Sequence, residues 1–563
     1  MRIALLALLA LVLAACGGEG EIDSEPLPGS TGGTGGGGTG GSGGTDAPGG
    51  SGGDLAPATV TWGACPDGPG VCTFVPVPVD WSEPEGDTLP FFVRKVPSAT
   101  QPSLGQLWLL QGGPGSAGWM FAQVADDFAA MAPGYDLYIP DYRGVGYSAW
   151  LGCEGDRPDS LVKSCFDALL ARWGDDLRHF STSATVRDIH YVIESTRRPE
   201  DRVLLYGVSY GTFVLNRFLT LFPEAADGAL LDSVCPARGC DIRMDHNANR
   251  VAEFAFGLCG EDAFCAGKLG GDPWGFLQDL LARIDAGHCS ELYSPLSNRN
   301  LIETLVVFGV TDPQTLPLAL ATVYRMDRCA PEDVAALSTL ANTLGGRAGG
   351  FDVFAGEESS LYLSDHVVFA EFWEEGLDKA KVEAELAELT FELGTLRRWA
   401  NTRASWPWPI VPTPAAEKRW SGTATPLLLL NGDLDYQTHL NGLLDVEESF
   451  VNGSQHYVQV PLAGHGVLFS SQIIDGRTYW TCGMQMAAGF FADPQAPVDT
   501  SCLDRVEPIR FTGSGRMASW LMGTSDLWEN GTGAGTALRA PLLPGEERAV
   551  QALVRRINER PSF

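Results

Sequence analysis

The sequence is short of basic residues, long apolar runs and paired metal-binding motifs. Its 38 Lys and Arg stand against 70 Asp and Glu, which gives a net charge of −32 at pH 7. Phosphates would repel such a chain, so we expect no nucleic-acid partner. Apart from a run at the N-terminus, no apolar stretch approaches the ~18 residues of a membrane-spanning helix. No Cys-x-x-Cys pair is present and no His stands at zinc-finger spacing from a Cys pair, so the cysteines do not indicate a zinc site.

Core-forming residues, in contrast, are abundant. Of the 563 residues, 44% are hydrophobic and 19% are charged, which excludes a fully disordered chain. The length predicts two to four domains at ~100–200 residues each.

The first residues are typical of an export signal. Arg2 supplies a positive charge, and residues 3–13 form an apolar run of signal-peptide length. The run ends in Leu13-Ala14-Ala15-Cys16, which resembles the lipobox of bacterial lipoproteins. This resemblance implies cleavage before Cys16, acylation of its thiol and an anchor in the lipid bilayer of the cell envelope. Because Gly17 rather than Asp follows, the outer membrane or cell surface is favoured. The alternative is a plain secretory signal that happens to contain Cys.

The segment after Cys16 is predicted to be a flexible tether. Residues 17–56 are rich in Gly, Ser and Thr and cannot bury a core. A chain of this length spans roughly 35 Å on average, enough to let a folded domain stand off a membrane. A passive low-complexity segment is the alternative.

The cysteines also fit an exported protein. Twelve remain after Cys16, an even number that indicates disulfides. Pairing sequence neighbours would give six bridges, although sequence alone does not define the connectivity.

Six short apolar runs predict buried strands of a mostly parallel sheet. They are residues 107–110, 137–140, 203–206, 229–231, 427–430 and 457–460. Uninterrupted runs of this kind are typical of strands covered on both faces, and helical patterns lie between them. Each run ends at polar or glycine-rich residues, which the fold would gather at the carboxyl edge of the sheet, where ligand sites form.

The strand series is interrupted by a long helical stretch. We therefore predict an α/β fold whose parallel sheet is flanked by helices, with a helical cap inserted after the sixth strand. The predicted units are a signal peptide (1–16), a tether (17–56), two parts of the core (57–234 and 421–515), the cap (235–420) and a C-terminal extension (516–563).

A nucleophilic serine is predicted at the end of the third run. Gly207-Val208-Ser209-Tyr210-Gly211 matches the Gly-x-Ser-x-Gly nucleophile elbow. Two further matches, centred on Ser42 and Ser51, lie in the tether, but only Ser209 follows a strand pattern and precedes a helical one. The alternative is a structural turn serine.

Serine needs a base and an orienting acid, which follow it in the order acid, then His, in this fold. His465 stands between glycines after the last predicted strand, so we predict it to be the base. His456 is expected in that strand and His439 in a loop beside the acid. We favour Asp435 as the acid, with Asp433 forming the turn. Asp232 is a distant third choice.

Backbone N–H groups must stabilise the oxyanion of the tetrahedral intermediate. Tyr210, directly after the nucleophile, is predicted to supply one donor. The second is predicted to be Gly113, in the glycine-rich loop Gly112-Gly113-Pro114-Gly115. A phosphate-binding loop is the rival interpretation, but no Gly-Lys-Ser/Thr follows.

Three motifs together resemble the α/β-hydrolase exopeptidases, namely the proline iminopeptidases and secreted tripeptidyl aminopeptidases. The motifs are residues 112–116 (GGPGS), 141–148 (DYRGVGYS) and 206–212 (YGVSYGT). Residues 432–435 (GDLD) and 463–466 (AGHG) are similar to the TAP-like C-terminal region of the tripeptidyl aminopeptidases. The resemblance implies peptide substrates, an acyl-enzyme on Ser209, release of N-terminal amino acids or short peptides, and no metal or cofactor. Two departures are Gln111, where the family often has His, and Tyr436-Gln437-Thr438-His439, where it often has Pro-x-Thr-Pro.

The resemblance also suggests a cap carboxylate for the substrate's ammonium group. Glu371 is the candidate, and Glu374 and Glu375 are weaker ones, with a solvated helix face as the alternative. An esterase on the same fold and an inactive surface-binding lipoprotein are the competing functions. The oligomeric state and the residue preference stay open.

Overall fold

The computed structural model describes residues 55–153, 161–290, 292, 298–345, 359–474, 480–530 and 541–558. The predicted signal peptide, Cys16 and nearly all of the predicted tether lie outside these residues. In the described part of the chain, no helix is both long and apolar enough to cross a membrane.

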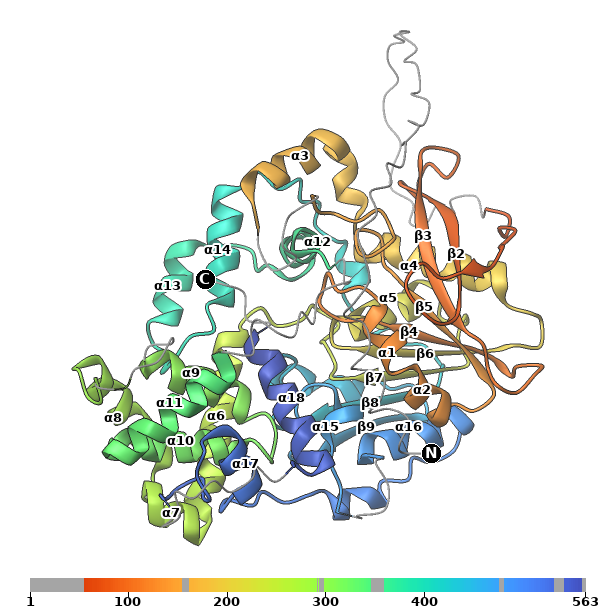
Figure 1. Cartoon of the computed structure of the whole chain (residues 1–563). Coiled ribbons are helices and arrows are strands. Elements are labelled where there is room, and N and C mark those ends of the chain that lie inside the picture. The colour runs from red at the N-terminus through yellow and green to blue at the C-terminus, as the bar shows by residue number, and fades with distance from the viewer. Residues whose placement is uncertain are drawn as a thin grey trace, which may run out of the picture. The chain divides into compact units, whose positions relative to one another are not determined.

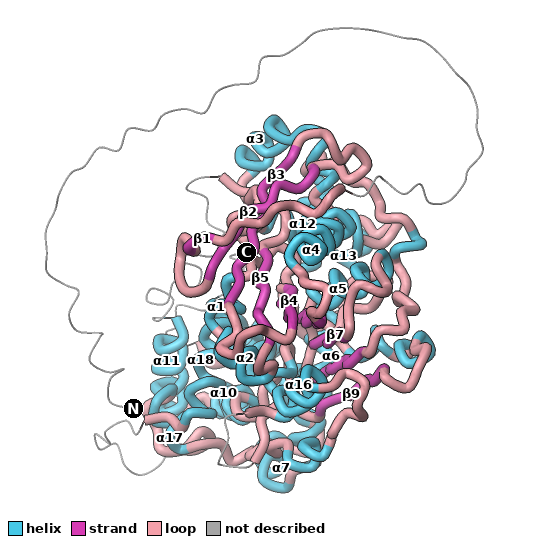
Figure 2. The backbone as a smooth tube through the Cα atoms, turned by 90° about the vertical axis from the view of Figure 1, so that its right-hand side faces the viewer, coloured by secondary structure: helices cyan, strands magenta, loops and turns pink. Residues whose placement is uncertain are grey.

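A sheet of nine described strands forms the centre of the protein (Figure 2). Its order is β1-β2-β3-β5-β4-β6-β7-β8-β9, and all neighbours from β5 to β9 pair in parallel. The strands are β1 (Gly63–Ala64), β2 (Val71–Pro78), β3 (Thr88–Val96), β4 (Gly105–Leu110), β5 (Tyr135–Pro140), β6 (Arg202–Val208), β7 (Gly228–Asp232), β8 (Leu427–Gly432) and β9 (Gln455–Val460). The six apolar runs correspond to β4–β9, which confirms the predicted mostly parallel sheet.

Strands β1–β3 extend one edge of the sheet in antiparallel pairing. Strand β2 was not predicted because it alternates instead of forming a continuous apolar run: Val75 and Val77 are buried, whereas Phe74 is 52% exposed. One face of β2 is thus open to solvent, as antiparallel sheets allow.

Helices cover both faces of the sheet because its side chains alternate between two apolar cores. Trp108 and Leu110 of β4 pack in a core with α3, α4 and α5, and Leu107 and Leu109 pack in a core with α1, α2 and α16. These helices are α1 (Trp119–Gln123), α2 (Ala125–Met131), α3 (Lys163–Trp173), α4 (Thr182–Thr196), α5 (Tyr210–Leu221) and α16 (Cys482–Ala492), with the short α15 (Val467–Ser470) after β9. Short helical turns are η1 (Gly174–His179), η3 (Ala415–Glu417), η4 (Leu440–Leu443), η5 (Val446–Ser449) and η6 (Ser501–Arg505).

The predicted helical insertion follows β7, which is the sixth strand if the two-residue β1 is left out. It begins with α6 (Met244–Glu261), α7 (Ala263–Leu269), α8 (Pro273–Asp285), α9 (Asn298–Gly309), α10 (Leu316–Arg328) and α11 (Pro331–Gly345). It continues with α12 (Leu361–Val367), the π-helical turn η2 (Val368–Phe372), α13 (Lys379–Leu386) and α14 (Thr395–Ser405).

The insertion divides between two cores. Helices α6–α11 share a core with the C-terminal tail, that is with Trp528, α17 (Gly515–Leu521) and α18 (Pro544–Asn558), and Figure 1 shows these helices side by side. Helices α12–α14 pack instead in the core of the sheet face that carries α5. We call these groups the outer helical part (α6–α11 with residues 511–530 and 541–558) and the inner helical part (α12–α14).

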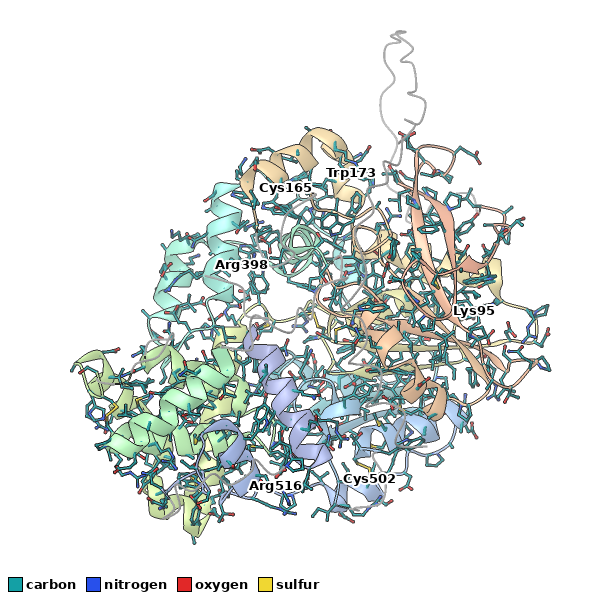
Figure 3. The ribbon with its side chains drawn as sticks, viewed as in Figure 1. Lys95, Cys165, Trp173, Arg398, Cys502 and Arg516 are labelled. Carbon is teal, nitrogen blue, oxygen red and sulfur yellow. A yellow bond between two sulfur atoms is a disulfide. The ribbon has the colours of Figure 1, made fainter. Side chains whose placement is uncertain are left out.

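All twelve described cysteines form disulfides, each with its neighbour in sequence. The pairs are Cys65–Cys72, Cys153–Cys165, Cys235–Cys240, Cys259–Cys265, Cys289–Cys329 and Cys482–Cys502. Figure 3 labels Cys165 and Cys502, which lie in distant parts of the fold. The disulfides predicted from the even cysteine count are confirmed.

Candidate active site

Ser209 occupies the sharp turn between β6 and α5. Its φ of +57° lies in the left-handed region, where a non-glycine residue is strained. A Cβ at Gly207 would lie 2.5 Å from the carbonyl oxygen of Gly211, and one at Gly211 would lie 2.1 Å from that of Leu110. Both flanking positions therefore require glycine. The turn holds Ser209 at the carboxyl edge of the sheet.

The glycine-rich loop after β4 lies directly against Ser209. A Cβ at Gly112 would lie 2.8 Å from the Cβ of Ser209, so only glycine permits this approach. The Gly112 N–H donates to Oε1 of Gln111 at 2.7 Å. Among the described residues, the N–H groups of Gly113 and Tyr210 have no hydrogen-bond acceptor. Two open donors thus belong to the two segments that meet at Ser209, as the predicted oxyanion hole requires.

Asp435 and His465 lie together on the neighbouring loops. The Nδ1 of His465 is 2.9 Å from Oδ2 and 3.0 Å from Oδ1 of Asp435, whose side chain is fully buried. Thr438 Oγ1 donates to Oδ2 at 2.7 Å, and the Gln437 and Thr438 N–H groups donate to Oδ1. This carboxylate can hold one imidazole orientation and tautomer.

The same contacts set the ionisation of Asp435. Burial alone would raise the pKa of its carboxyl, but His465 and the hydrogen bonds from His465 and Thr438 outweigh burial and lower the pKa to about 2. The group is therefore an anion throughout the neutral pH range, as an orienting acid must be.

Asp232 connects the serine turn with the histidine loop. Its carbonyl oxygen accepts the Ser209 N–H at 3.0 Å, and its carboxylate accepts the N–H groups of Val467 and Leu468 at 2.7 and 3.1 Å. The next residue, Ser233, accepts the Gly466 N–H at 2.8 Å. No hydrogen bond joins Ser209 to His465 among the described contacts, and catalytic hydrogen bonds are often long in the absence of substrate.

The other candidates have different partners. Asp433 accepts the Leu462 N–H at 2.6 Å, and burial raises its pKa to about 6. His456 lies within β9 and His439 caps η4 through its ring nitrogen, as expected of each. In the structure Asp435 is thus the acidic candidate that contacts His465.

Glu371 lies in η2 against α5, but its carboxylate is already paired. Its Oε2 is 3.2 Å from Nη2 of Arg217, and both side chains are 1% exposed. Arg217 also pairs with Glu417 at 3.2 Å. Glu374 pairs with Arg243, and Glu375 is exposed. If Glu371 bound a substrate ammonium group, as predicted, that group would compete with Arg217 for the same carboxylate.

Three residues that position the acid or the histidine loop were not predicted from the sequence in that role. They are Asp232, which was weighed only as the acid, Ser233 and Thr438. Thr438 had a signal, because the family's Pro-x-Thr-Pro also has Thr three residues after the acid. The contacts of Asp232 and Ser233 join segments more than 230 residues apart, which no local pattern encodes. Among the described residues, no group of three or more His, Cys, Asp or Glu could hold a metal ion.

Two family models match this chain. Residues 107–256 match the alpha/beta hydrolase fold and residues 394–502 match the TAP-like protein model. The chain has the α/β-hydrolase fold with a TAP-like C-terminal part. The first match contains Ser209 and both oxyanion candidates, and the second contains Asp435 and His465.

Curated relatives include peptidases. The chain is 29% identical over 212 residues to a tripeptidyl aminopeptidase of Streptomyces lividans, covering 33% of this chain and 38% of that protein. It is 24% identical over 240 residues to the serine protease Hip1 of Mycobacterium tuberculosis, covering 37% and 44%. This chain thus matches less than half of the length of either relative. A proline iminopeptidase structure from Mycobacterium smegmatis aligns at 15% identity over 75% of this chain and 98% of its own, with a TM-score of 0.33.

Proposed function

We propose that this α/β hydrolase is a serine exopeptidase that releases N-terminal amino acids or short peptides. The observation that carries the proposal is the contact of His465 with the buried Asp435, connected through Asp232 to the strained turn of Ser209. The peptidase relatives supply the choice of substrate class.

The residues suggest an acyl-transfer mechanism. His465 takes the proton of the Ser209 hydroxyl as the oxygen attacks the scissile carbonyl carbon, and Asp435 stabilises the imidazolium. The N–H groups of Gly113 and Tyr210 stabilise the oxyanion. His465 then protonates the leaving amine, the acyl group stays on Ser209, and water attacks it by the same route to release the product.

An assay on aminoacyl- and tripeptidyl-nitroanilides with free and acetylated N-termini tests this proposal. We expect cleavage of the free-amine amides, loss of cleavage on acetylation, and a silent Ser209→Ala variant. Cleavage of acetylated and free substrates at equal rates would contradict an exopeptidase that requires a free amino terminus.

An esterase is the second candidate, because Arg217 already neutralises Glu371. In that case a nitrophenyl ester would be turned over while every amide is left intact. A surface-binding lipoprotein without activity would hydrolyse neither, and a serine-directed phosphonate would fail to label Ser209.

We further propose that Cys16 carries a lipid anchor. The support is the lipobox-like sequence and the glycine-rich segment after it. A Cys16→Ser variant expressed in a lipoprotein-processing bacterium is expected to lose palmitate labelling and to leave the membrane fraction. Membrane association at the wild-type level would contradict the anchor.

A further inference from the structure

A cavity of about 330 Å³ lies beside the oxyanion loop, apart from Ser209. It is lined by Asp67, Arg94, Gly118, Trp119, Asp141 and Tyr147, with Phe92 at its wall. Asp141 directly follows β5, and Gly118 follows the Gly112–Gly115 loop by three residues. The cavity therefore borders a segment that continues from the oxyanion loop.

Asp141 is a buried carboxylate without a cationic partner. It is 4% exposed, and its two oxygens accept the N–H groups of Gly118 at 2.8 Å and Tyr147 at 2.9 Å. No ion pair reaches it from the described residues. Burying an anion is costly unless a cation or enough hydrogen bonds compensate for the lost water.

Arg94 is a cation in the lining of this cavity, but its ion pair, hydrogen bonds and ring contact are with residues other than Asp141. It pairs with Asp67, donates to the carbonyl oxygen of Pro69 at 2.7 Å and lies over the Trp119 ring at 5.6 Å. The cavity thus holds an ion pair that is neutral overall, plus the additional negative charge of Asp141.

The walls suit an organic cation. Phe92 and Tyr147 pack with their ring centroids 4.9 Å apart, and Trp119 completes an aromatic lining. Aromatic faces attract cations, and a carboxylate beside them adds a hydrogen-bond acceptor for N–H donors. We infer that this cavity binds a primary ammonium group, with Asp141 as its counter-ion.

Two sources could supply this ammonium group: a small free amine, or the amino terminus of a peptide bound at Ser209. The second source rests on the proposed function. Strand β6, which directly precedes Ser209, lies two positions along the sheet from β5, which directly precedes Asp141. Strands lie about 4.8 Å apart, so the separation along the sheet edge is on the order of 10 Å, the reach of roughly three extended residues.

Calorimetric titration of the Ser209→Ala protein tests the site without requiring turnover. The probes are alanine amide, trialanine amide and the N-acetylated form of each. We expect a free-amine probe to bind at least tenfold more tightly than its acetylated form. Binding of alanine amide would identify a free-amine site, and binding of trialanine amide alone would identify a peptide terminus. Equal binding of free and acetylated probes, or no binding of any probe at millimolar concentration, would overturn the inference.

Variants then assign the charge to Asp141. Asp141→Asn is expected to weaken ammonium binding at least tenfold. The matched control Asp136→Asn changes a carboxylate of β5, the strand that Asp141 directly follows, but one outside the cavity, and it should bind normally. Because Asp141 also holds two loop N–H groups, Trp119→Leu provides a second variant that removes an aromatic wall and keeps the carboxylate. A folded Asp141→Asn protein with wild-type affinity, or unchanged affinity in Trp119→Leu, would overturn the assignment.

The pH dependence gives an independent readout. Burial raises the pKa of Asp141, the Tyr147 and Gly118 N–H groups and Arg94 lower it, and Asp67 raises it; together they bring the pKa to about 6. Since the ammonium needs the ionised carboxylate, affinity should fall as pH drops through about 6 in the wild type. The comparison is made below pH 7, where the α-amine of each probe stays protonated. Affinity independent of pH between 5 and 7 would contradict Asp141 as the counter-ion.

Discussion

The inner helical part and helices α6–α11 of the outer helical part come from one insertion, yet the two parts support different pieces of the candidate site. The inner part contacts the oxyanion loop: the Ser360 N–H, at the start of α12, donates to the Gly115 carbonyl oxygen at 2.8 Å. The outer part contacts the acid loop, because Leu434 and Tyr436, on either side of Asp435, are buried in its core.

This difference suggests that the outer helical part and the sheet edge contribute to different properties of the protein. Alternate residues of the acid loop face opposite ways, so Leu434 and Tyr436 anchor the loop among the helices while Asp435 contacts His465. The C-terminal tail in turn completes the outer core, since Trp528 is fully buried there. Changes in the outer part should therefore act mainly on stability, and changes at the sheet edge mainly on catalysis.

The largest expected effect is on catalysis at the sheet edge. Asp435→Asn keeps the shape of the side chain but removes the charge that holds His465, so kcat should fall about 10⁴-fold. The melting temperature should change little by comparison. Peptide-nitroanilide kinetics and calorimetry on the same preparation measure both quantities.

The matched control is Asp433→Asn, which changes a carboxylate two residues away that bonds to Leu462 rather than to His465. Its kcat should stay within a few-fold of wild type. If both variants lost activity equally, Asp435 would have no special role.

The outer helical part should respond in stability. Arg325 is fully buried, pairs with Asp333 at 2.9 Å and donates to the tail carbonyls of Asp526, Leu527 and Glu529. Arg325→Met leaves these acceptors unsatisfied and should destabilise the protein by about 3–5 kcal/mol. Calorimetry should show an earlier unfolding transition, while kcat below that transition stays within a few-fold.

Arg516→Ala is the surface control, because Arg516 lies in the same tail and is 45% exposed in its pair with Glu546. An exposed pair of this kind contributes about 0–1 kcal/mol. An equal loss of stability in both variants would contradict a buried clamp at Arg325.

The inner helical part is held to α5 by the pair of Arg217 and Glu371. Replacing Arg217 by Met alone buries an unpaired carboxylate and should cost about 3–5 kcal/mol. The double variant Arg217→Met with Glu371→Leu should recover most of that stability, as measured by chemical denaturation.

The same pair of variants separates a structural Glu371 from one that binds substrate. A structural role predicts that the stable double variant keeps its KM for free-amine substrates. A rise in KM without a change in kcat would instead restore Glu371 as the ammonium ligand.

Features defined by neighbouring residues could be predicted from the sequence, whereas contacts between segments far apart in the chain could not. Strands β4–β9 are continuous apolar runs, and Ser209, Asp435 and His465 follow their ends, so periodicity and motif spacing suffice to find them. The division of the insertion between two cores is not visible in sequence, because a helical pattern identifies an apolar face but not its partner. Ser233 and the bridging carboxylate of Asp232 were missed because their hydrogen-bond partners lie more than 230 residues away in the sequence.

The smallest expected effect concerns Thr438. Residues 436–439 differ from the pattern Pro-x-Thr-Pro, but Thr438 keeps its threonine. Its hydroxyl donates to Asp435 at 2.7 Å and lies 3.5 Å from Nδ1 of His465. Thr438→Val removes this hydrogen bond at constant volume, and since a bond to a charged group contributes about 1.5 kcal/mol, kcat should fall about tenfold. Thr438→Ser should keep most of the wild-type rate, because it retains the hydroxyl that donates the hydrogen bond. If Thr438→Ser were as slow as Thr438→Val, packing of the methyl group, and not the hydrogen bond, would position the acid.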